Sequence, residues 1–274
     1  MSQIVIIGAG WLGKPLAQAL LADGHHVSAT STSTDGVNRL QDDGIPAFEC
    51  DLAKPETLQE HLKQRNCEIV IGCFPPGFRR GNADDYIHYW ASIVTHARTA
   101  GVKKILMVSS TSVYPTEAKT MVESDASYVQ STASDAFTDN AKRLLQAEQC
   151  VIDSGLDYAI VRCSGLMGPE RHPSRFVARL SAISDQAPAN MIHQTDAIGV
   201  LRFALSNIHR DVVNATTPTT VDKAQFYRAA LKQANMTTPL PPITHTGDKR
   251  VSAEKLVKLG YVFHYQSTLD ALAL

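Results

Sequence analysis

Short apolar runs alternate with amphipathic segments over about the first 165 residues. The apolar runs are QIVIIGA (3–9), HHVSAT (25–30), PAFECD (46–51), EIVIGCF (68–74), KKILMVSS (103–110) and DYAIVRCS (157–164). Most of them are continuous Val/Ile-rich stretches without polar alternation, which is typical of strands covered by helices on both faces. We therefore predict a buried strand for each run.

The segments between these runs have the apolar spacing of amphipathic helices. They are LGKPLAQALLADG, DGVNRLQDDG, KPETLQEHLKQRN, DDYIHYWASIVTHARTAG and DNAKRLLQAEQCVIDSG. Gly24, Gly44, Gly101 and Gly155 stand where helices are expected to end, and glycine is common just past a helix C-terminus. This alternation of strands and helices predicts the fold class, an α/β protein with a Rossmann-type doubly wound parallel sheet.

The pattern changes after about residue 165. A stretch rich in Gly, Pro, Ser and charge is followed by helix candidates DAIGVLRFALSNI, VDKAQFYRAALKQAN and SAEKLVKLG and by a short strand DVVNA. We predict that residues 1–165 form the Rossmann domain, with 192–215 returning to it. The small C-terminal lobe, expected on the substrate side, is then 166–191 and 216–274.

The first predicted strand leads into a glycine motif. Gly8, Gly10 and Gly13, with Trp11 and Leu12 between them, form a G-x-G-x-x-G turn between a strand and a helix. In a dinucleotide site the first glycine permits the tight turn and the second admits the pyrophosphate. The third lets helix and strand pack closely, and the helix N-terminus faces the phosphates. The motif predicts an NAD(P) site.

The end of the second predicted strand bears on the choice between NAD and NADP. An acidic residue about 20 positions after the glycines usually holds the ribose 2′-hydroxyl of NAD. Ser31 and Thr32 stand in this stretch, and the first carboxylate is Asp35. Hydroxyl groups can accommodate a 2′-phosphate without repelling it, so the sequence favours NADP over NAD, although no arginine is present to clamp that phosphate. The alternative is that the Ser/Thr run is a solvated loop.

Ordered landmarks along nearly the whole chain resemble the NAD-dependent epimerase/dehydratase family, and more closely an atypical branch of the extended short-chain dehydrogenases/reductases. They are VSSTSVYP (108–115), the Asp51-Leu52 pair, Cys73-Phe74-Pro75, VRCSGLMGPERHPSRF, NMIHQTDAIGVL and KRVSAEKLVKLGYVF. The resemblance implies that Ser110 is the catalytic serine and that Asp51 and Leu52 cap the adenine. It also implies cofactor contacts from Cys73, Phe74, Pro75, Ser109, Ser164 and Leu166.

The chain departs from this family at its acid/base residue. The family uses the tyrosine of Tyr-x-x-x-Lys, in which the lysine four residues later lies on the same helix face and lowers the phenol pKa. Thr138 stands in place of that tyrosine, and Lys142 is retained. The catalytic candidates are therefore Ser110, Lys142 and Thr138, with Lys142 also expected to hold the nicotinamide ribose. An aliphatic hydroxyl is far too weak an acid to replace a phenol.

Other residues are candidates for the missing proton relay or for substrate contact. Tyr114, Tyr128 and Asp139 are possible substitutes for the tyrosine, against the alternative that they serve packing or solvation. The predicted substrate contacts are Thr111, Ser112, Tyr114, Arg171 and His172, since arginine suits an anionic group. His193 is expected to be a buried structural histidine. The aromatic residues of DDYIHYWASIVTHA are expected in the core, or at a dimer interface as in this superfamily.

Composition excludes several classes of function. The 274 residues include 44% hydrophobic and 19% charged residues and carry a formal net charge of -1, so no global field favours nucleic acid or acidic membranes. Five scattered cysteines without C-x-x-C spacing predict reduced thiols and no zinc site. No signal peptide or membrane segment is recognised, so we expect a cytoplasmic protein, a monomer or homodimer without a metal.

These observations predict an NAD(P)-dependent oxidoreductase or epimerase-type enzyme acting on a small hydroxyl or carbonyl substrate. Ser110 would polarise the substrate oxygen. Two alternatives stay open. The first is a catalytically weak or inactive NAD(P)-binding sensor, which the missing tyrosine favours. The second is an isomerase or dehydratase with tightly bound NAD, because the fold alone does not decide the chemistry.

Overall fold

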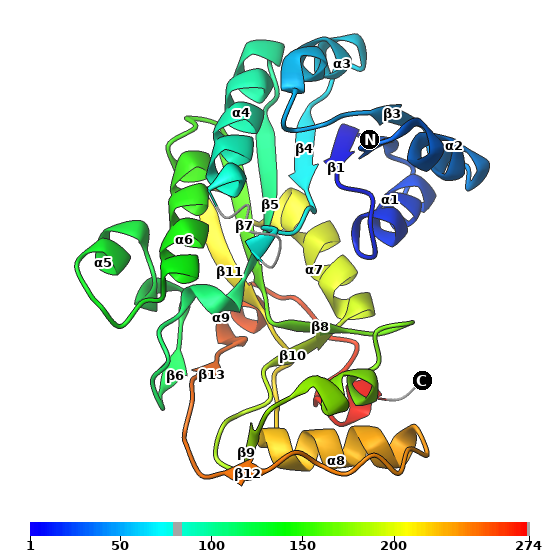
Figure 1. The fold of residues 1–274 in the computed structure, drawn as a ribbon. Coiled ribbons are helices and arrows are strands. Elements are labelled where there is room, and N and C mark those ends of the chain that lie inside the picture. The colour runs from blue at the N-terminus through cyan, green and yellow to red at the C-terminus, as the bar shows by residue number, and fades with distance from the viewer. Residues whose placement is uncertain (79–83, 273–274) are drawn as a thin grey trace. The chain divides into compact units, whose positions relative to one another are not determined.

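A seven-stranded parallel sheet forms the centre of the computed structural model, which describes residues 1–78 and 84–272. The strand order is β11-β7-β5-β4-β1-β2-β3 (Figure 1). The bounds are β1 Gln3–Ile7, β2 His26–Ser31, β3 Ala47–Glu49, β4 Ile69–Gly72, β5 Lys104–Ser110, β7 Asp157–Cys163 and β11 Asp211–Ala215. All six predicted apolar runs are strands of this sheet, so the predicted fold class is confirmed.

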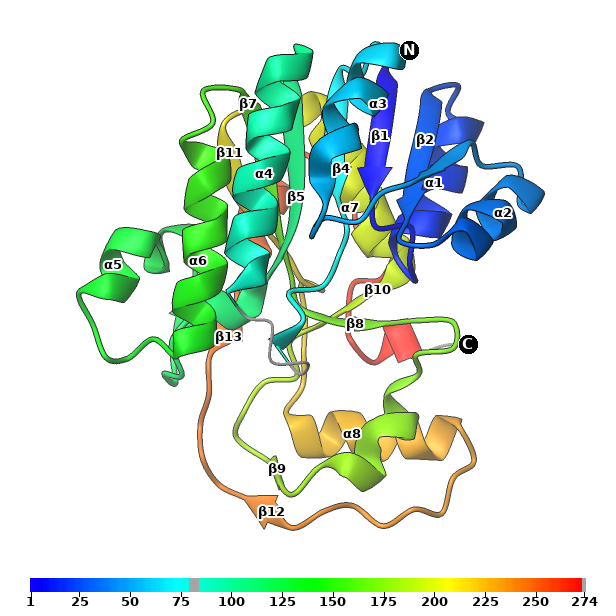
Figure 2. The ribbon, with the colours of Figure 1, turned by 45° about the horizontal axis from the view of Figure 1, so that its top comes forward.

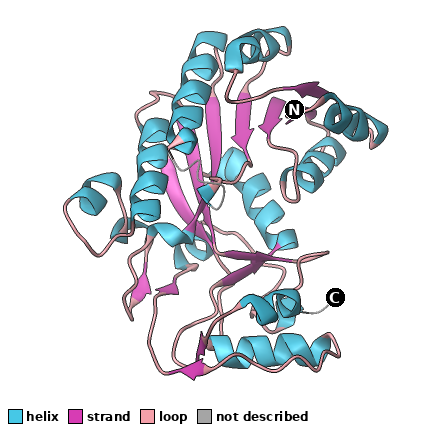
Figure 3. Ribbon diagram, in the orientation of Figure 1, coloured by secondary structure: helices cyan, strands magenta, loops and turns pink. Residues whose placement is uncertain are grey.

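Helices cover both faces of the sheet and the strands lie inside (Figure 3). The helices are α1 Gly13–Ala22, α2 Thr34–Asp42, α3 Leu58–Gln64, α4 Asp85–Ala100, α6 Asp139–Ile152 and α7 Gln194–Asn207. Helices α3, α4 and α6 lie side by side on one face (Figure 2). On the other face, Arg202 of α7 pairs with Asp23 at the end of α1 at 2.6 Å. The glycines predicted to end helices have φ between 76° and 85°.

The chain divides into two compact units. Unit 1 contains residues 1–109, 127–161 and 201–212, and unit 2 contains 110–126, 162–200 and 213–274. The sequence places the lobe at 166–191 and 216–274, whereas unit 2 also takes in 110–126, 162–165, 192–200 and 213–215. The additional segments are joined to unit 2 by tertiary hydrogen bonds, which leave no periodic signal in the sequence.

The core of unit 1 is built on β1, whose apolar residues Ile4–Ile7 are at most 2% exposed. On α4, Tyr86 and Trp90 are buried, and Trp90 packs directly on Gly72, where a Cβ would lie 2.2 Å from the indole. Part of the predicted aromatic stripe therefore belongs to the core. Lys104 of β5 is buried as well and donates to the carbonyls of Ala204, Leu205 and Ile208 at the end of α7.

Unit 2 packs around α8 (Lys223–Gln233), where Phe226 and Ala230 meet Met167 and Leu272 in an apolar cluster. Its other elements are short. They are β6 Thr120–Met121, β8 Gly165–Met167, β9 Ile183–Ser184, β10 Met191–His193, β12 Ile243–Thr244, β13 Arg250–Val251 and α9 Glu254–Lys258. The sequence predicts α7, α8 and α9 but none of these two- or three-residue strands, nor the short helix α5 (Tyr128–Thr132) of unit 1.

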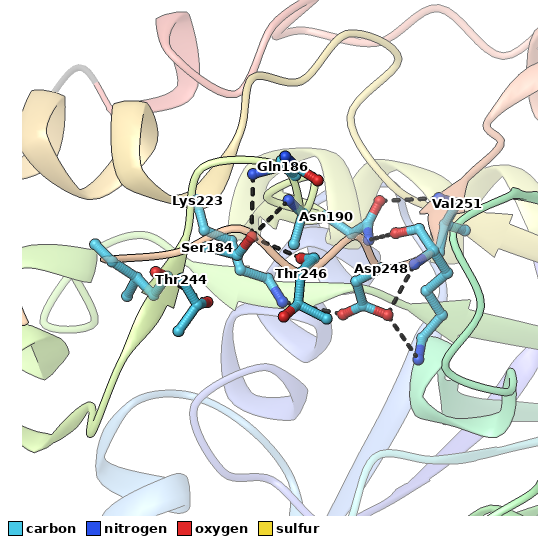
Figure 4. Close-up of polar contacts among 11 residues, drawn as sticks. Ser184, Gln186, Asn190, Lys223, Thr244, Thr246, Asp248 and Val251 are labelled. Carbon is cyan, nitrogen blue, oxygen red and sulfur yellow. Dashed lines mark hydrogen bonds and ion pairs between the residues drawn. The ribbon is translucent and has the colours of Figure 1, made fainter. Parts of the chain in front are cut away.

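Polar side chains fix the C-terminal segment of unit 2 (Figure 4). Asp248 accepts from Lys223 Nζ at 3.0 Å and from the Lys249 backbone N–H at 2.8 Å. Asn190 donates to the Lys249 carbonyl and accepts from the Val251 N–H, at 2.8 and 2.9 Å. The segment thereby gains hydrogen bonds that its two-residue strands alone do not provide.

A buried carboxylate ties α7 to the chain end. Asp196 is 0% exposed and accepts from the backbone N–H groups of His264 and Tyr265 at 2.7 and 3.0 Å. Beside it, His193 stacks edge-on against Tyr265, with ring centroids 4.8 Å apart, and is buried as the sequence predicts. Burial lowers the pKa of His193, with Asp196 acting in the opposite direction.

Candidate functional site

The glycine turn between β1 and α1 has the geometry that the motif predicts. Gly8 has a φ of +95°, and a Cβ there would lie 3.0 Å from the Phe74 nitrogen. A Cβ on Gly13 would lie 2.2 Å from the Gly8 carbonyl oxygen, so only glycine permits this close approach of helix and strand. At Gly10, by contrast, nothing lies within 4 Å of a Cβ position. The second glycine therefore borders open space, as required for a pyrophosphate.

The N-terminus of α1 carries no side-chain cap. The residue preceding the helix is Leu12, and no side chain accepts a hydrogen bond from its first turn. Trp11 is half-buried in the same turn. Backbone N–H groups and the helix dipole favour an anion at such an end. The turn thus offers a phosphate site through its backbone.

Thr30, at the end of β2, shapes the turn and was not predicted. Its hydroxyl accepts from Gly8 N–H at 3.1 Å, and its carbonyl accepts from Ala9 N–H at 3.2 Å. The side chain is 3% exposed. Threonine is common in strands, so nothing in the sequence marks Thr30 as the residue whose hydroxyl binds the Gly8 N–H. Only the pairing of β1 with β2 places its hydroxyl at the glycine turn.

Beyond β2 the hydroxyl residues surround the start of α2. Ser33 is the N-cap and accepts from Gly36 N–H at 3.2 Å. Ser31 packs onto Gly36, where a Cβ would meet its Oγ at 1.9 Å, and Thr32 is exposed. Two residues of the run, Ser31 and Ser33, are therefore engaged with the first turn of α2.

The other predicted nucleotide contacts lie in unit 1 at the ends of β3 and β4. Asp51 is exposed and accepts from Ala53 N–H at 2.9 Å, which fixes the turn that contains Leu52. Cys73 donates its N–H to Ile7 of β1, directly beside the glycine turn. Phe74 stacks on Trp90 with centroids 5.2 Å apart, and Pro75 is exposed. The sequence also offers Arg79 and Arg80, expected as a solvated pair or else at the cofactor mouth, and both lie outside the described residues.

Ser109 uses its hydroxyl inside unit 1. Its Oγ donates to Glu148 of α6 at 2.6 Å, and both side chains are buried. Glu148 also lies close enough to Tyr86 to act on it electrostatically, and burial together with that charge raises the pKa of the phenol. The cofactor contact of Ser109 stays a prediction. Because the hydroxyl already donates to Glu148, we expect the backbone of Ser109 to make that contact.

Ser110 begins unit 2 and caps the 3-10 turn Thr111–Val113. Its Oγ accepts from Ser112 N–H at 3.1 Å and from the Ser112 hydroxyl at 2.8 Å. Thr111 is buried, whereas Ser112 is exposed. A hydroxyl oxygen that already accepts two hydrogen bonds keeps its own proton for an outside acceptor. Ser110 is thus arranged as a donor.

Tyr114 lies in a buried polar network of unit 2. Its hydroxyl donates to Asn214 Oδ1 at 2.6 Å and accepts from Arg162 at 3.0 Å. Arg162 also donates to the carbonyls of Glu123 and Ala126, and both Arg162 and Tyr114 are 2% exposed. Burial raises the pKa of Tyr114 to about 12, with Arg162 acting against the rise. These contacts favour the packing alternative for Tyr114.

Thr138 and Lys142 open α6. Thr138 is the N-cap, and its hydroxyl accepts from Ala141 N–H at 3.2 Å. Lys142 lies in the first turn, is half-buried, and donates its backbone N–H to Thr138. The segment matching Tyr-x-x-x-Lys thus straddles a helix start, and threonine suits a cap better than tyrosine does. Tyr128 begins α5, which packs against α6.

The remaining predicted residues lie in unit 2. Ser164 is buried and its hydroxyl donates to the Ala215 carbonyl at 3.3 Å, while Leu166 in β8 is half-buried. Arg171 is exposed. His172 is buried, caps the 3-10 segment Pro173–Arg179 and lies 2.8 Å from the Ser174 hydroxyl. Burial lowers the pKa of His172.

The five cysteines are free. Burial raises the pKa of Cys50 to about 11 and that of Cys163 to about 12, so these remain thiols. The described residues hold no group of three or more His, Cys, Asp or Glu side chains arranged for a metal ion. None of the described helices has both the length and the apolar character needed to cross a membrane.

A glycine turn of this geometry, at the carboxyl edge of a doubly wound sheet, defines a dinucleotide-binding Rossmann domain. A family model described as NAD(P)H-binding matches residues 8–206, and the chain belongs to this NAD(P)H-binding family. The protein YeeZ of Escherichia coli is 30% identical over 211 residues, which are 75% of this chain and 73% of YeeZ. The predicted resemblance is confirmed at the level of an NAD(P)-binding family.

Solved structures share the fold. The UDP-glucuronic acid 4-epimerase of Bacillus cereus, in complex with NAD, has a TM-score of 0.77 at 16% identity, covering 98% of this chain and 95% of its own. The enzyme WbmH of Bordetella bronchiseptica, in complex with NAD+, has a TM-score of 0.77 at 15% identity, covering 100% and 96%. At these identities the likeness concerns the fold alone, and it extends over almost the whole chain.

Proposed function

We propose that the protein is an NAD(P)-dependent oxidoreductase or epimerase-type enzyme that acts on a small hydroxyl or carbonyl substrate. The observation that carries the proposal is the glycine turn, in which Gly10 borders open space and the N-terminus of α1 lacks a side-chain cap. A bound dinucleotide would supply or accept the hydride. The cofactor turn is the part of the proposal tested first, because it needs no substrate.

Ser110 would act on the substrate oxygen. Its Oγ already accepts from the N–H and the hydroxyl of Ser112, so its own proton is available to a carbonyl oxygen. In the direction of reduction, donation to that oxygen polarises the carbonyl toward hydride addition, and water would supply the proton that the resulting alkoxide oxygen takes up. In this proposal Lys142 holds the nicotinamide ribose, as the family resemblance implies. Thr138 is left out because its hydroxyl caps α6.

The substitution Gly10→Val tests the cofactor site. A Cβ at this position meets no atom within 4 Å, so the fold should tolerate the change. The side chain would occupy the space needed by the pyrophosphate, and we expect the affinity for NADH and NADPH to fall at least about a hundredfold. Nucleotide fluorescence titrations measure the affinity, and thermal unfolding controls for the fold. Unchanged affinity in a folded variant would refute the site.

A second candidate function is an NAD(P)-binding sensor without turnover. It is favoured by the commitment of the Thr138 hydroxyl to a helix cap and of the Tyr114 hydroxyl to Asn214. A panel of aldehydes, ketones and alcohols, screened for cofactor oxidation or reduction, separates the two functions. If the protein is an enzyme, the wild type should turn over the cofactor, and Ser110→Ala should abolish this turnover but still bind NADH. Turnover that survives in Ser110→Ala refutes the role of this serine, and a flat screen with tight NADH binding favours the sensor.

A further inference from the structure

The carboxylate missing from the end of β2 is supplied by the next strand. Strands β2 and β3 pair in parallel at one edge of the sheet, and Ser31 lies opposite Glu49 in their register. Cys50 N–H donates to the Ser31 carbonyl at 2.8 Å, so the pairing holds through the last residue of each strand. Because parallel strands end at the same edge, Glu49 and Ser31 lie at the same end of the sheet.

A hydrogen bond fixes the Glu49 side chain over the start of α2. Thr34 Oγ1 donates to Glu49 Oε2 at 2.7 Å, and Thr34 is the first residue of α2 after its cap Ser33. The other carboxylate oxygen, Oε1, has no hydrogen bond among the residues that the structure describes. Glu49 is exposed. A fixed carboxylate with one available oxygen can accept from a hydroxyl group of a ligand.

The charge on the segment that leads from β2 into α2 disfavours a bound phosphate. No lysine or arginine stands between Thr30 and Val37, and the first turn of α2 carries a second carboxylate, Asp35. In dinucleotide sites this end of β2 faces the adenosine ribose, where NADP carries a 2′-phosphate and NAD a hydroxyl. A carboxylate there attracts the hydroxyl as an acceptor and repels the phosphate.

We propose that Glu49 is the specificity-determining residue for the cofactor, and that it selects NAD over NADP. The inference rests on the proposed dinucleotide site and concerns the part of that site that faces the adenosine ribose. It reverses the preference for NADP that the hydroxyl run suggests, because the strand register brings in a carboxylate that stands eighteen residues further along the chain.

The test is the ratio of dissociation constants for NADH and NADPH, measured by nucleotide fluorescence on the full chain. We expect the wild type to bind NADH at least about tenfold more tightly than NADPH. Glu49→Gln keeps the hydrogen bond acceptor but removes the charge, and should shrink the ratio about tenfold, mainly by tightening NADPH. Raising the salt concentration should reduce the wild-type ratio and leave the variant ratio nearly constant.

Two matched variants make the outcome specific. Glu60→Gln removes the same charge from an exposed position on α3 and should leave the ratio unchanged. Asp35→Asn removes the neighbouring charge at the start of α2 and should change the ratio less than Glu49→Gln does. A wild type that prefers NADPH, or a ratio that moves only with Asp35→Asn, would overturn the role of Glu49. Binding of neither nucleotide would overturn the cofactor site itself.

Discussion

Removal of the Tyr114 hydroxyl tests whether this tyrosine is a packing residue or a replacement for the missing acid/base group. In Tyr114→Phe, Asn214 Oδ1 loses its donor at 2.6 Å and Arg162 loses one acceptor at 3.0 Å. The ring and its contact with the guanidinium, at 5.2 Å, are retained. One neutral and one charged hydrogen bond together correspond to about 2–3 kcal/mol of unfolding free energy. For a chain of this length the loss lowers Tm by about 5–10 °C.

The assay combines thermal and urea unfolding with NADH titration. Tyr128→Phe is the matched control, since this tyrosine lies at the start of α5 and no hydrogen bond of its hydroxyl is described; its Tm should change by less than about 2 °C. NADH affinity should stay within about twofold of the wild type in both variants, because the Tyr114 hydroxyl bonds to Asn214 and Arg162 and to no residue of the glycine turn. A Tyr114→Phe protein as stable as the wild type, or one that loses turnover without losing stability, would refute the packing role.

The two remaining predictions concern buried ionisable groups. In Lys104→Met three carbonyls at the end of α7 lose their donor, so we expect the unfolding free energy measured in urea to fall by about 2–4 kcal/mol. The control is Lys103→Met: the Lys103 side chain is 73% exposed, so this change should alter the unfolding free energy by less than about 1 kcal/mol. Because burial lowers the pKa of His193 below its ordinary 6.5, the unfolded state binds the extra proton. Stability should therefore fall as the pH drops through about 6.5, and His193→Gln should reduce that fall in pH-dependent unfolding; equal slopes would refute it.

The sequence determined the fold class, the cofactor turn and most of the helices of this protein. Continuous Val/Ile runs are strands buried on both faces, and glycines end the helices, because both signals depend on neighbours close along the chain. The G-x-G-x-x-G turn has the same local character: Gly8 needs a positive φ, and Gly13 must let its own helix approach its own strand. The missing tyrosine was also visible from the sequence alone.

Only the tertiary structure decided which polar groups meet when they lie on different strands or far apart along the chain. Thr30 at the glycine turn, Glu49 opposite Ser31 and Arg162 on Tyr114 all depend on strand register or on contacts between residues far apart in the chain. The sequence candidates Tyr114 and Thr138 both carry a hydroxyl, but folding commits one hydroxyl to a buried network and the other to a helix cap. A side chain's chemistry follows from its partners, and partners at long range are set by packing rather than by local pattern.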